Sequence, residues 1–131
     1  MIDPALALTP EHLKHLSAVS LAYVGDAVYE LFVRQAALWP PRRLEEIHRQ
    51  VVQRVQAPAQ AHILTCLWQE LTPAEHSIAL WGRNGSGKGS ALARQASAWE
   101  TLIGYLYVTD PQRLEYLLLR SLTIEIPQSL P

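Results

Sequence analysis

The chain has 131 residues, about the size of one compact domain, and 49% of them are hydrophobic, which is enough to build a core. Charged residues make up 18%, and this composition excludes a disordered tail and a collagen-like fibre. The net charge of −1 does not by itself indicate a nucleic-acid partner. The single cysteine, Cys66, excludes an internal disulfide, and its apolar neighbours predict that it is buried.

Helix-start signals recur along the chain, whereas strand signals are nearly absent. Three dipeptides place an N-cap side chain before a proline suited to the first helical turn: Thr9-Pro10, Thr72-Pro73 and Asp110-Pro111. Between these signals, apolar residues recur at helical spacing. In chain order the pattern predicts helices over residues 10–16, 18–38, 42–56, 58–71, 73–82, 90–108 and 111–122. We therefore expect one all-α domain of about seven helices over residues 1–131.

The most apolar window, residues 17–39, is long enough for a membrane helix. It contains Asp26, Glu30 and Arg34, however, and charges are costly at membrane depth. The N-terminus also lacks the basic start and apolar run of a signal peptide. We expect a buried helix of a soluble, cytoplasmic protein that has no membrane partner.

Asp26 is the most unusual residue of this helix. It follows Gly25 in mid-helix, where both residues have weak helix propensity. The glycine indicates a close approach of another helix or of a ligand. Glu30 and Arg34 follow Asp26 on the same helical face, and we expect them to form an ordinary surface ion pair.

Glu100 is the second unusual carboxylate, because its helical neighbours are all small: Ala93, Ala96, Ser97 and Gly104. A carboxylate in such surroundings is either paired or coordinates something. For Asp26 and Glu100, the sequence is equally compatible with backbone or arginine contacts and with a metal site. Oxygen ligands from two helices would suit Mg²⁺.

Basic residues gather around the glycine-rich segment of residues 85–90. No acidic residue lies between Glu75 and Glu100, while Arg83, Lys88 and Arg94 all do. The spacing from Gly82 to Lys88 matches a phosphate-binding P-loop, but Gly89 stands where that motif requires Ser or Thr. A helix is also expected where the motif needs a strand. We therefore expect no nucleotide cofactor.

The histidines and tryptophans give weaker signals. No histidine forms a close set with carboxylates, so we expect the histidines at the surface or at helix ends. The tryptophans are expected to pack in the core or in a dimer interface.

The segment from Leu21 to Glu30 reads Leu-Ala-Tyr-Val-Gly-Asp-Ala-Val-Tyr-Glu and resembles the signature helix of ribonuclease III domains. In its tyrosine form it is similar to the short Mini-III type of that family. The segment from Trp99 to Tyr107 matches the family's second catalytic segment, and Gly82-Arg83-Asn84 resembles its basic loop entry. His48 and residues 55–61 resemble a further family segment. The resemblance covers about residues 16–109.

The resemblance implies that Asp26 and Glu100 are the two catalytic carboxylates and that they bind Mg²⁺. Larger ribonuclease III enzymes carry two further acids, at positions that hold Ala22 and Ser97 here, and Mini-III members share this reduced set. The implied activity is hydrolysis of double-stranded RNA that leaves a 5′-phosphate and a 3′-hydroxyl. The expected phosphate contacts come from the basic loop and its flanks: Arg83, Asn84, Lys88 and Arg94.

The resemblance further implies a homodimer that faces one RNA duplex, a stem of precursor ribosomal RNA as the natural substrate, and no double-stranded-RNA-binding domain. The alternative is a non-catalytic RNA-binding or ribosome-associated helical module with the same fold. A purely structural helical dimer is a third interpretation. Asp26 and Glu100 favour the enzyme, because an inactive scaffold has no need of buried carboxylates.

Overall fold

The computed structural model describes residues 2–87 and 89–130, and it is built from α-helices. In chain order these are α1 (Pro10–Leu13), α2 (Ala18–Ala36), α3 (Leu44–Val55), α4 (Ala57–Leu67), α5 (Pro73–Gly85), α6 (Ala91–Thr109) and α7 (Pro111–Leu122). Two short 3₁₀ helices, η1 (Pro4–Leu6) and η2 (Trp68–Glu70), precede α1 and follow α4. Over the described residues, the predicted all-α fold of seven helices is confirmed.

The three predicted helix starts are confirmed at the atomic level. The side chains of Thr9, Thr72 and Asp110 each accept a hydrogen bond from the backbone N–H three residues ahead. At α5 the cap is reciprocal, because the backbone N–H of Thr72 donates to Glu75 Oε1 at 2.9 Å. Each of these side chains satisfies a backbone donor that the first helical turn leaves unpaired.

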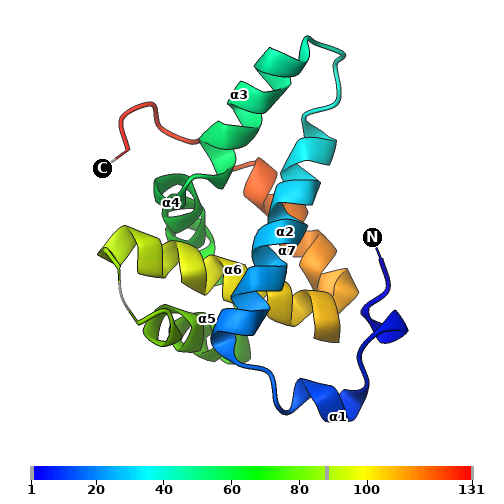
Figure 1. Cartoon of the computed structure of the whole chain (residues 1–131). Helices are drawn as coiled ribbons and strands as arrows, with labels where there is room; N and C mark the ends of the chain where they lie inside the picture. Colours follow the sequence, from blue (N-terminus) through cyan, green and yellow to red (C-terminus); the bar gives the residue numbers. More distant parts are fainter. Residues whose placement is uncertain (1, 88, 131) are drawn as a thin grey trace.

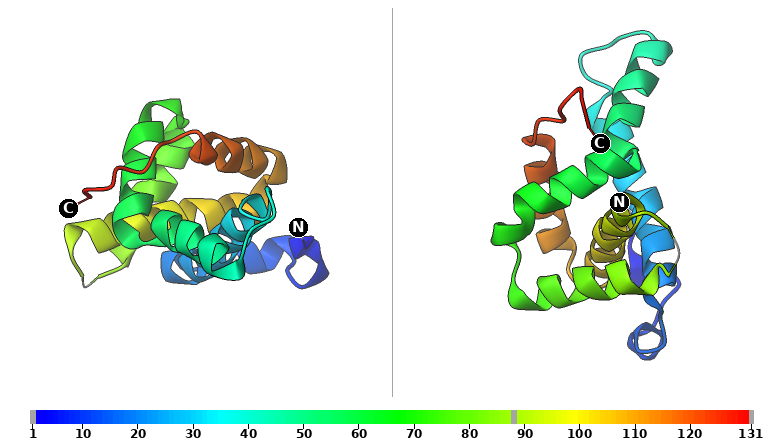
Figure 2. Two further views of the ribbon diagram at one scale, coloured as in Figure 1. Left: turned by 90° about the horizontal axis from the view of Figure 1, so that it is seen from above. Right: turned by 90° about the vertical axis from the view of Figure 1, so that its left-hand side faces the viewer.

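Helix α6 lies in the middle of the fold and packs against α2, α4, α5 and α7. Figures 1 and 2 show it in yellow, with α2 crossing it and α4, α5 and α7 packed around it. Its side chains Trp99, Leu102 and Ile103 are fully buried in the core. The helix that carries Glu100 is therefore held from several sides.

Several predicted boundaries differ from the structure. Helix α1 ends at Leu13 rather than at residue 16, and the helix expected over 58–71 ends at Leu67 and continues as η2. Helix α5 runs to Gly85 rather than to residue 82. It continues because the backbone reverses only at Gly87 (φ +69°) and Gly89 (φ +133°), where glycine tolerates a positive φ.

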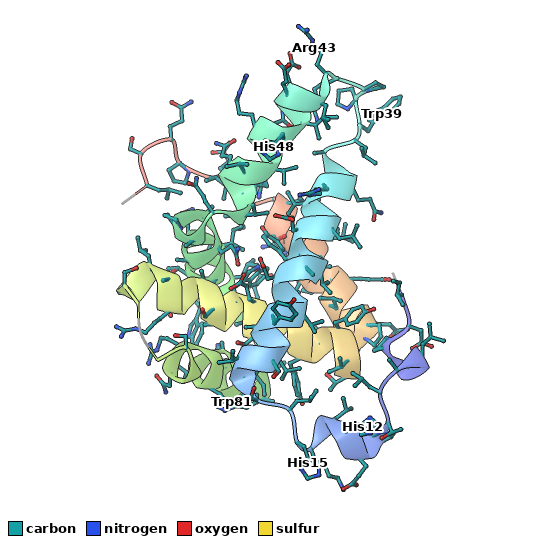
Figure 3. The ribbon with its side chains drawn as sticks, viewed as in Figure 1. His12, His15, Trp39, Arg43, His48 and Trp81 are labelled. Atoms are coloured by element: carbon teal, nitrogen blue, oxygen red, sulfur yellow. The ribbon has the colours of Figure 1, made fainter. Side chains whose placement is uncertain are left out.

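The prediction that Cys66 is buried was wrong. For Trp39 the core placement is not observed, whereas the alternative, packing in a dimer interface, stays a prediction. Cys66 is exposed rather than buried. Trp39 is 79% exposed and lies with Arg43 at the projecting connection between α2 and α3 (Figure 3). Both residues have apolar neighbours in the sequence, but no other helix covers them. Among the described residues, no helix has the length and apolar character needed to span a membrane.

Candidate active site

The site is built where α2 crosses α6, and two glycines make this crossing close. A Cβ atom on Gly25 would overlap the backbone carbonyl of Glu100 and would lie 2.7 Å from the amide nitrogen of Gly104. A Cβ on Gly104 would likewise overlap the carbonyl of Leu21. The close approach predicted from Gly25 is therefore confirmed, and the partner is a helix. Asp26 follows that glycine directly, so the crossing brings it to Glu100.

Asp26 and Glu100 lie side by side at this crossing. Glu100 is half-buried, whereas Asp26 is exposed, so the expectation of two buried carboxylates was wrong for Asp26. Burial, followed by a side-chain hydrogen bond and charge repulsion from Asp26, raises the pKa of Glu100 to about 8. Two carboxylates held this close cannot both be ionised at low cost, so one of them retains a proton unless a cation is present.

The structure does not pair either carboxylate with a basic side chain. Over residues 2–87 and 89–130, no Lys, Arg or His lies within ion-pair distance of Asp26 or Glu100. Glu30, one turn after Asp26, is instead bound to Arg34 at 3.1 Å, which confirms the predicted surface pair. The sequence left open backbone or arginine contacts on the one hand and a metal site on the other; of these, ion pairs with arginine are excluded for the described residues.

The donor set fits a hard divalent cation. Both candidate ligands are carboxylates, which Mg²⁺ prefers, and a cation between them would offset their repulsion. Among the described residues, no group of three or more His, Cys, Asp and Glu side chains is placed to hold a metal. Mg²⁺ retains several waters and takes few protein ligands, so two carboxylates are compatible with it.

Gln60 of α4 is a third residue at this site, and the sequence analysis did not assign it a role. Its side chain is 3% exposed, and a hydrogen bond from it lowers the pKa of Glu100, opposing the effect of Asp26. Its amide nitrogen also donates to the carbonyl of Val55 at 2.7 Å. A glutamine in the apolar run of residues 57–67 was the available signal, but its direction toward α6 could not be read from the sequence.

A basic cavity lies between the end of α5 and the start of α6. It has a volume of about 420 Å³ and is lined by Arg83, Asn84, Gly87, Ala91, Arg94 and Gln95. Three of the four predicted phosphate contacts therefore face one cavity, and the fourth, Lys88, lies outside the described residues. Gln95 is a further polar lining residue that the sequence analysis missed.

The remaining predictions concern other possible sites. His12 and His15 lie at α1, and His48 lies exposed on α3 (Figure 3), so these histidines are at the surface as predicted. Trp99 is buried and packs edge-on against Tyr29, with ring centroids 5.7 Å apart. The segment before the glycine-rich loop is helix α5, not the strand that a P-loop would need.

Comparisons with known proteins identify the family of this chain. The sequence model of the Ribonuclease III domain family matches residues 19–111. The chain is 47% identical to a Mini-ribonuclease 3 of Thermosynechococcus vestitus over 111 residues, which cover 81% of this chain and 72% of that protein. It is 46% identical to a Mini-ribonuclease 3 of Synechocystis, covering 91% of this chain and 85% of the relative.

A solved structure supports the fold independently. The crystal structure of a Fusobacterium nucleatum protein superposes with a TM-score of 0.75 at 21% identity, covering 84% of this chain and 94% of the other. That identity is low enough that the similarity is evidence for the fold alone. Taken with the family match and the curated relatives, the chain belongs to the ribonuclease III family of endoribonucleases, within the Mini-ribonuclease 3 type.

Proposed function

We propose that this endoribonuclease hydrolyses phosphodiester bonds of double-stranded RNA with Mg²⁺ held by Asp26 and Glu100. The observation that carries the proposal is the pair of adjacent carboxylates without a basic partner among the described residues. Strongly shifted carboxyl groups are concentrated at functional sites. A divalent cation is the partner that this pair lacks.

Each carboxylate has a distinct part in the proposed mechanism. Glu100 is half-buried between helices, so it holds a fixed position, whereas Asp26 is exposed at the surface that an RNA strand would approach. When bound, Mg²⁺ lowers the pKa of a water and offsets charge on the scissile phosphate. Asp26 and Glu100 would fix the position of the ion and supply the negative charge that binds it.

We assign the phosphate contacts to the basic cavity. Arg83 and Arg94 have no carboxylate within ion-pair distance among residues 2–87 and 89–130, so their charge is available to a ligand. Asn84 adds an uncharged donor on the same wall of the cavity. A-form RNA is recognised largely by shape and by its phosphates and 2′-hydroxyls, which suits a site with few base-reading groups. Lys88 remains a predicted contact.

We also propose that the active form is a homodimer. Helix α2 exposes a row of apolar side chains beside Asp26, namely Val19, Tyr23 and Leu31. Tyr23 is 83% exposed, which is costly for an aromatic side chain in water. A second copy packed on this row would bring two sites to one duplex, whose strands are related by a pseudo-twofold axis.

The test is cleavage of a labelled RNA duplex at low salt, with Mg²⁺ or with EDTA. We expect cleavage only with Mg²⁺, and a loss of more than about 100-fold in Asp26→Asn and Glu100→Gln, since these changes remove the ion's ligands themselves. Arg34→Ala, which removes a charge already paired with Glu30, is the control and should retain activity. Binding of the duplex without cleavage would instead favour the non-catalytic RNA-binding module.

The natural substrate is proposed to be a stem of precursor ribosomal RNA, as the family resemblance implies. Comparing a precursor ribosomal stem with an unrelated duplex of equal length tests this part separately. Equal rates on both would contradict a ribosomal preference while leaving the nuclease proposal intact.

A further inference from the structure

Gln60 is a buried polar residue in the most apolar part of α4. Its neighbours Ala59, Ala61, Ile63 and Leu64 are all buried, and its own side chain is 3% exposed. Burying an amide is unfavourable unless its hydrogen-bonding groups find partners, and an apolar side chain would fill this position without that cost. The presence of glutamine here therefore requires a reason other than packing.

The side-chain amide of Gln60 has two polar neighbours. One is the carbonyl of Val55, the last residue of α3, at 2.7 Å. The other is the carboxylate of Glu100 on α6, whose pKa the Gln60 side chain lowers. A glutamine amide nitrogen carries two donors, so one N–H remains available to the Glu100 carboxylate. The side chain is therefore fixed to the backbone at the α3–α4 junction and faces the Glu100 carboxylate.

The amide oxygen of Gln60, by contrast, is buried and has no hydrogen-bond partner among the described residues. A buried acceptor without a partner lowers stability rather than raising it. Such groups are rare in folded proteins, and a functional role is one of their explanations. Here the unpaired oxygen belongs to the same amide that holds the candidate metal ligand.

We propose that Gln60 is a positioning residue of the metal site, which holds the Glu100 carboxylate in place for the cation. The inference rests on the proposed function, because it requires a cation at Asp26 and Glu100. Groups that orient metal-binding side chains typically contribute 10- to 100-fold to metal affinity. Gln60 is expected to contribute within that range.

The experiment measures Mn²⁺ binding to the full chain by the electron paramagnetic resonance signal of the free ion, without RNA. The variant Gln60→Met replaces the amide by an apolar chain of similar length. We expect its dissociation constant for Mn²⁺ to rise about 10- to 100-fold. The matched control is Gln56→Met, because Gln56 is exposed and its side-chain amide donates only to the nearby carbonyl of Gln53, at 3.2 Å.

Two further readouts separate positioning from a structural role. The melting temperature of Gln60→Met should stay within a few degrees of the wild type, because the change also removes the unpaired oxygen. In cleavage assays the variant should need more Mg²⁺, and saturating Mg²⁺ should bring kcat back toward the wild-type value. A merely structural glutamine would lower the melting temperature and leave the Mg²⁺ requirement unchanged, which would overturn the inference.

The outcomes distinguish this inference from the proposed function. If Asp26→Asn abolishes Mn²⁺ binding while Gln60→Met binds as tightly as the wild type, the positioning role is wrong and the metal site stands. If the wild type binds no Mn²⁺ through Asp26 and Glu100, both are wrong. Should Gln60→Met fail to fold, Gln60→Asn keeps a buried amide one carbon short of Glu100, and wild-type affinity in it would equally overturn the inference.

Discussion

Acidic side chains lie at helix contacts in two regions of the molecule. In one region arginines pair with them, and in the other they have no basic partner among the described residues. At the junction of α5 and α7, Glu75 is bound to Arg113 at 2.8 Å, and near it Glu70 is bound to Arg120 at 2.6 Å. Hydrogen bonds from these arginines help to hold the pKa of both carboxyl groups below the usual value, against the effect of burial. At the crossing of α2 and α6, the pKa of Glu100 is raised instead, by burial and by Asp26.

In the first region the protein neutralises its own charges, whereas in the second the charges remain available to a ligand. Glu75 and Arg113 neutralise each other, so they stabilise the junction and need no further partner. Among the described residues, the two carboxylates at the crossing have no basic partner, and Arg83 and Arg94 in the basic cavity have no carboxylate partner. The negative carboxylates suit a metal cation, and the positive arginines suit the phosphates of RNA.

The largest effect should come from separating the two carboxylates. In Gly25→Ala the added methyl group would overlap the Glu100 carbonyl, so α2 and α6 must move apart. We expect a loss of about 3 kcal/mol or more in the free energy of unfolding, measured by urea denaturation, because backbone atoms cannot yield as side chains do. Ala27→Ser, at an exposed position on the same helix, should cost no more than about 0.5 kcal/mol. Equal stability of Gly25→Ala and the wild type would contradict the close crossing.

The paired region should respond strongly to loss of its carboxylate. Glu75→Gln removes a nearly buried charge that accepts from Arg113 Nε and Nη2 at 2.8 and 2.9 Å. We expect a loss of roughly 2–3 kcal/mol in the free energy of unfolding, since Arg113 is left without its charge partner. Glu70→Gln, whose pair is more exposed, should cost less. A larger loss for Glu70→Gln would reverse the order that burial predicts.

A third effect is a pH dependence of opposite sign in the two regions. The folded-state pKa of Glu100 is raised from 4.5 to about 8, so its contribution to stability is fully present below pH 4.5 and is lost as pH rises toward 8. The melting temperature of the wild type, relative to that of Glu100→Gln, should therefore fall as the pH rises from 4.5 toward 8. Excess Mg²⁺ should restore the wild type at the upper end. For Glu75, whose pKa is lowered, the contribution is lost only as pH falls into the acidic range. If the difference in melting temperature between the wild type and Glu100→Gln did not change with pH, the predicted contrast between Glu100 and Glu75 would be wrong.

The smallest effect should come from single arginines of the cavity. Arg83→Ala and Arg94→Ala should each weaken binding of an RNA duplex by about tenfold or less and reduce the slope of log affinity against log salt by about one. Each change removes one phosphate contact without altering the carboxylate pair, so Mn²⁺ binding should not change. Fluorescence anisotropy over a salt series measures the slope. An unchanged slope in both variants would show that the RNA lies elsewhere.

The sequence alone determined the helical architecture and the candidate carboxylates. Capping residues such as Thr72 and Asp110, together with the 3.6-residue spacing of apolar side chains, predicted the helices because these signals act between near neighbours in the chain. Asp26 and Glu100 stood out because a carboxylate in an apolar helix is locally unfavourable.

Only the tertiary structure decided which of these residues meet and which remain exposed. Gly25 predicted a close neighbour, but the packing of α6 on α2 determined that this neighbour carries Glu100. Gln60 joined the site because α4 turns that side of its apolar surface toward α6, and Cys66 and Trp39 stayed exposed because no helix covers them. Burial depends on the partner that covers a helical face, and that partner is distant in the sequence.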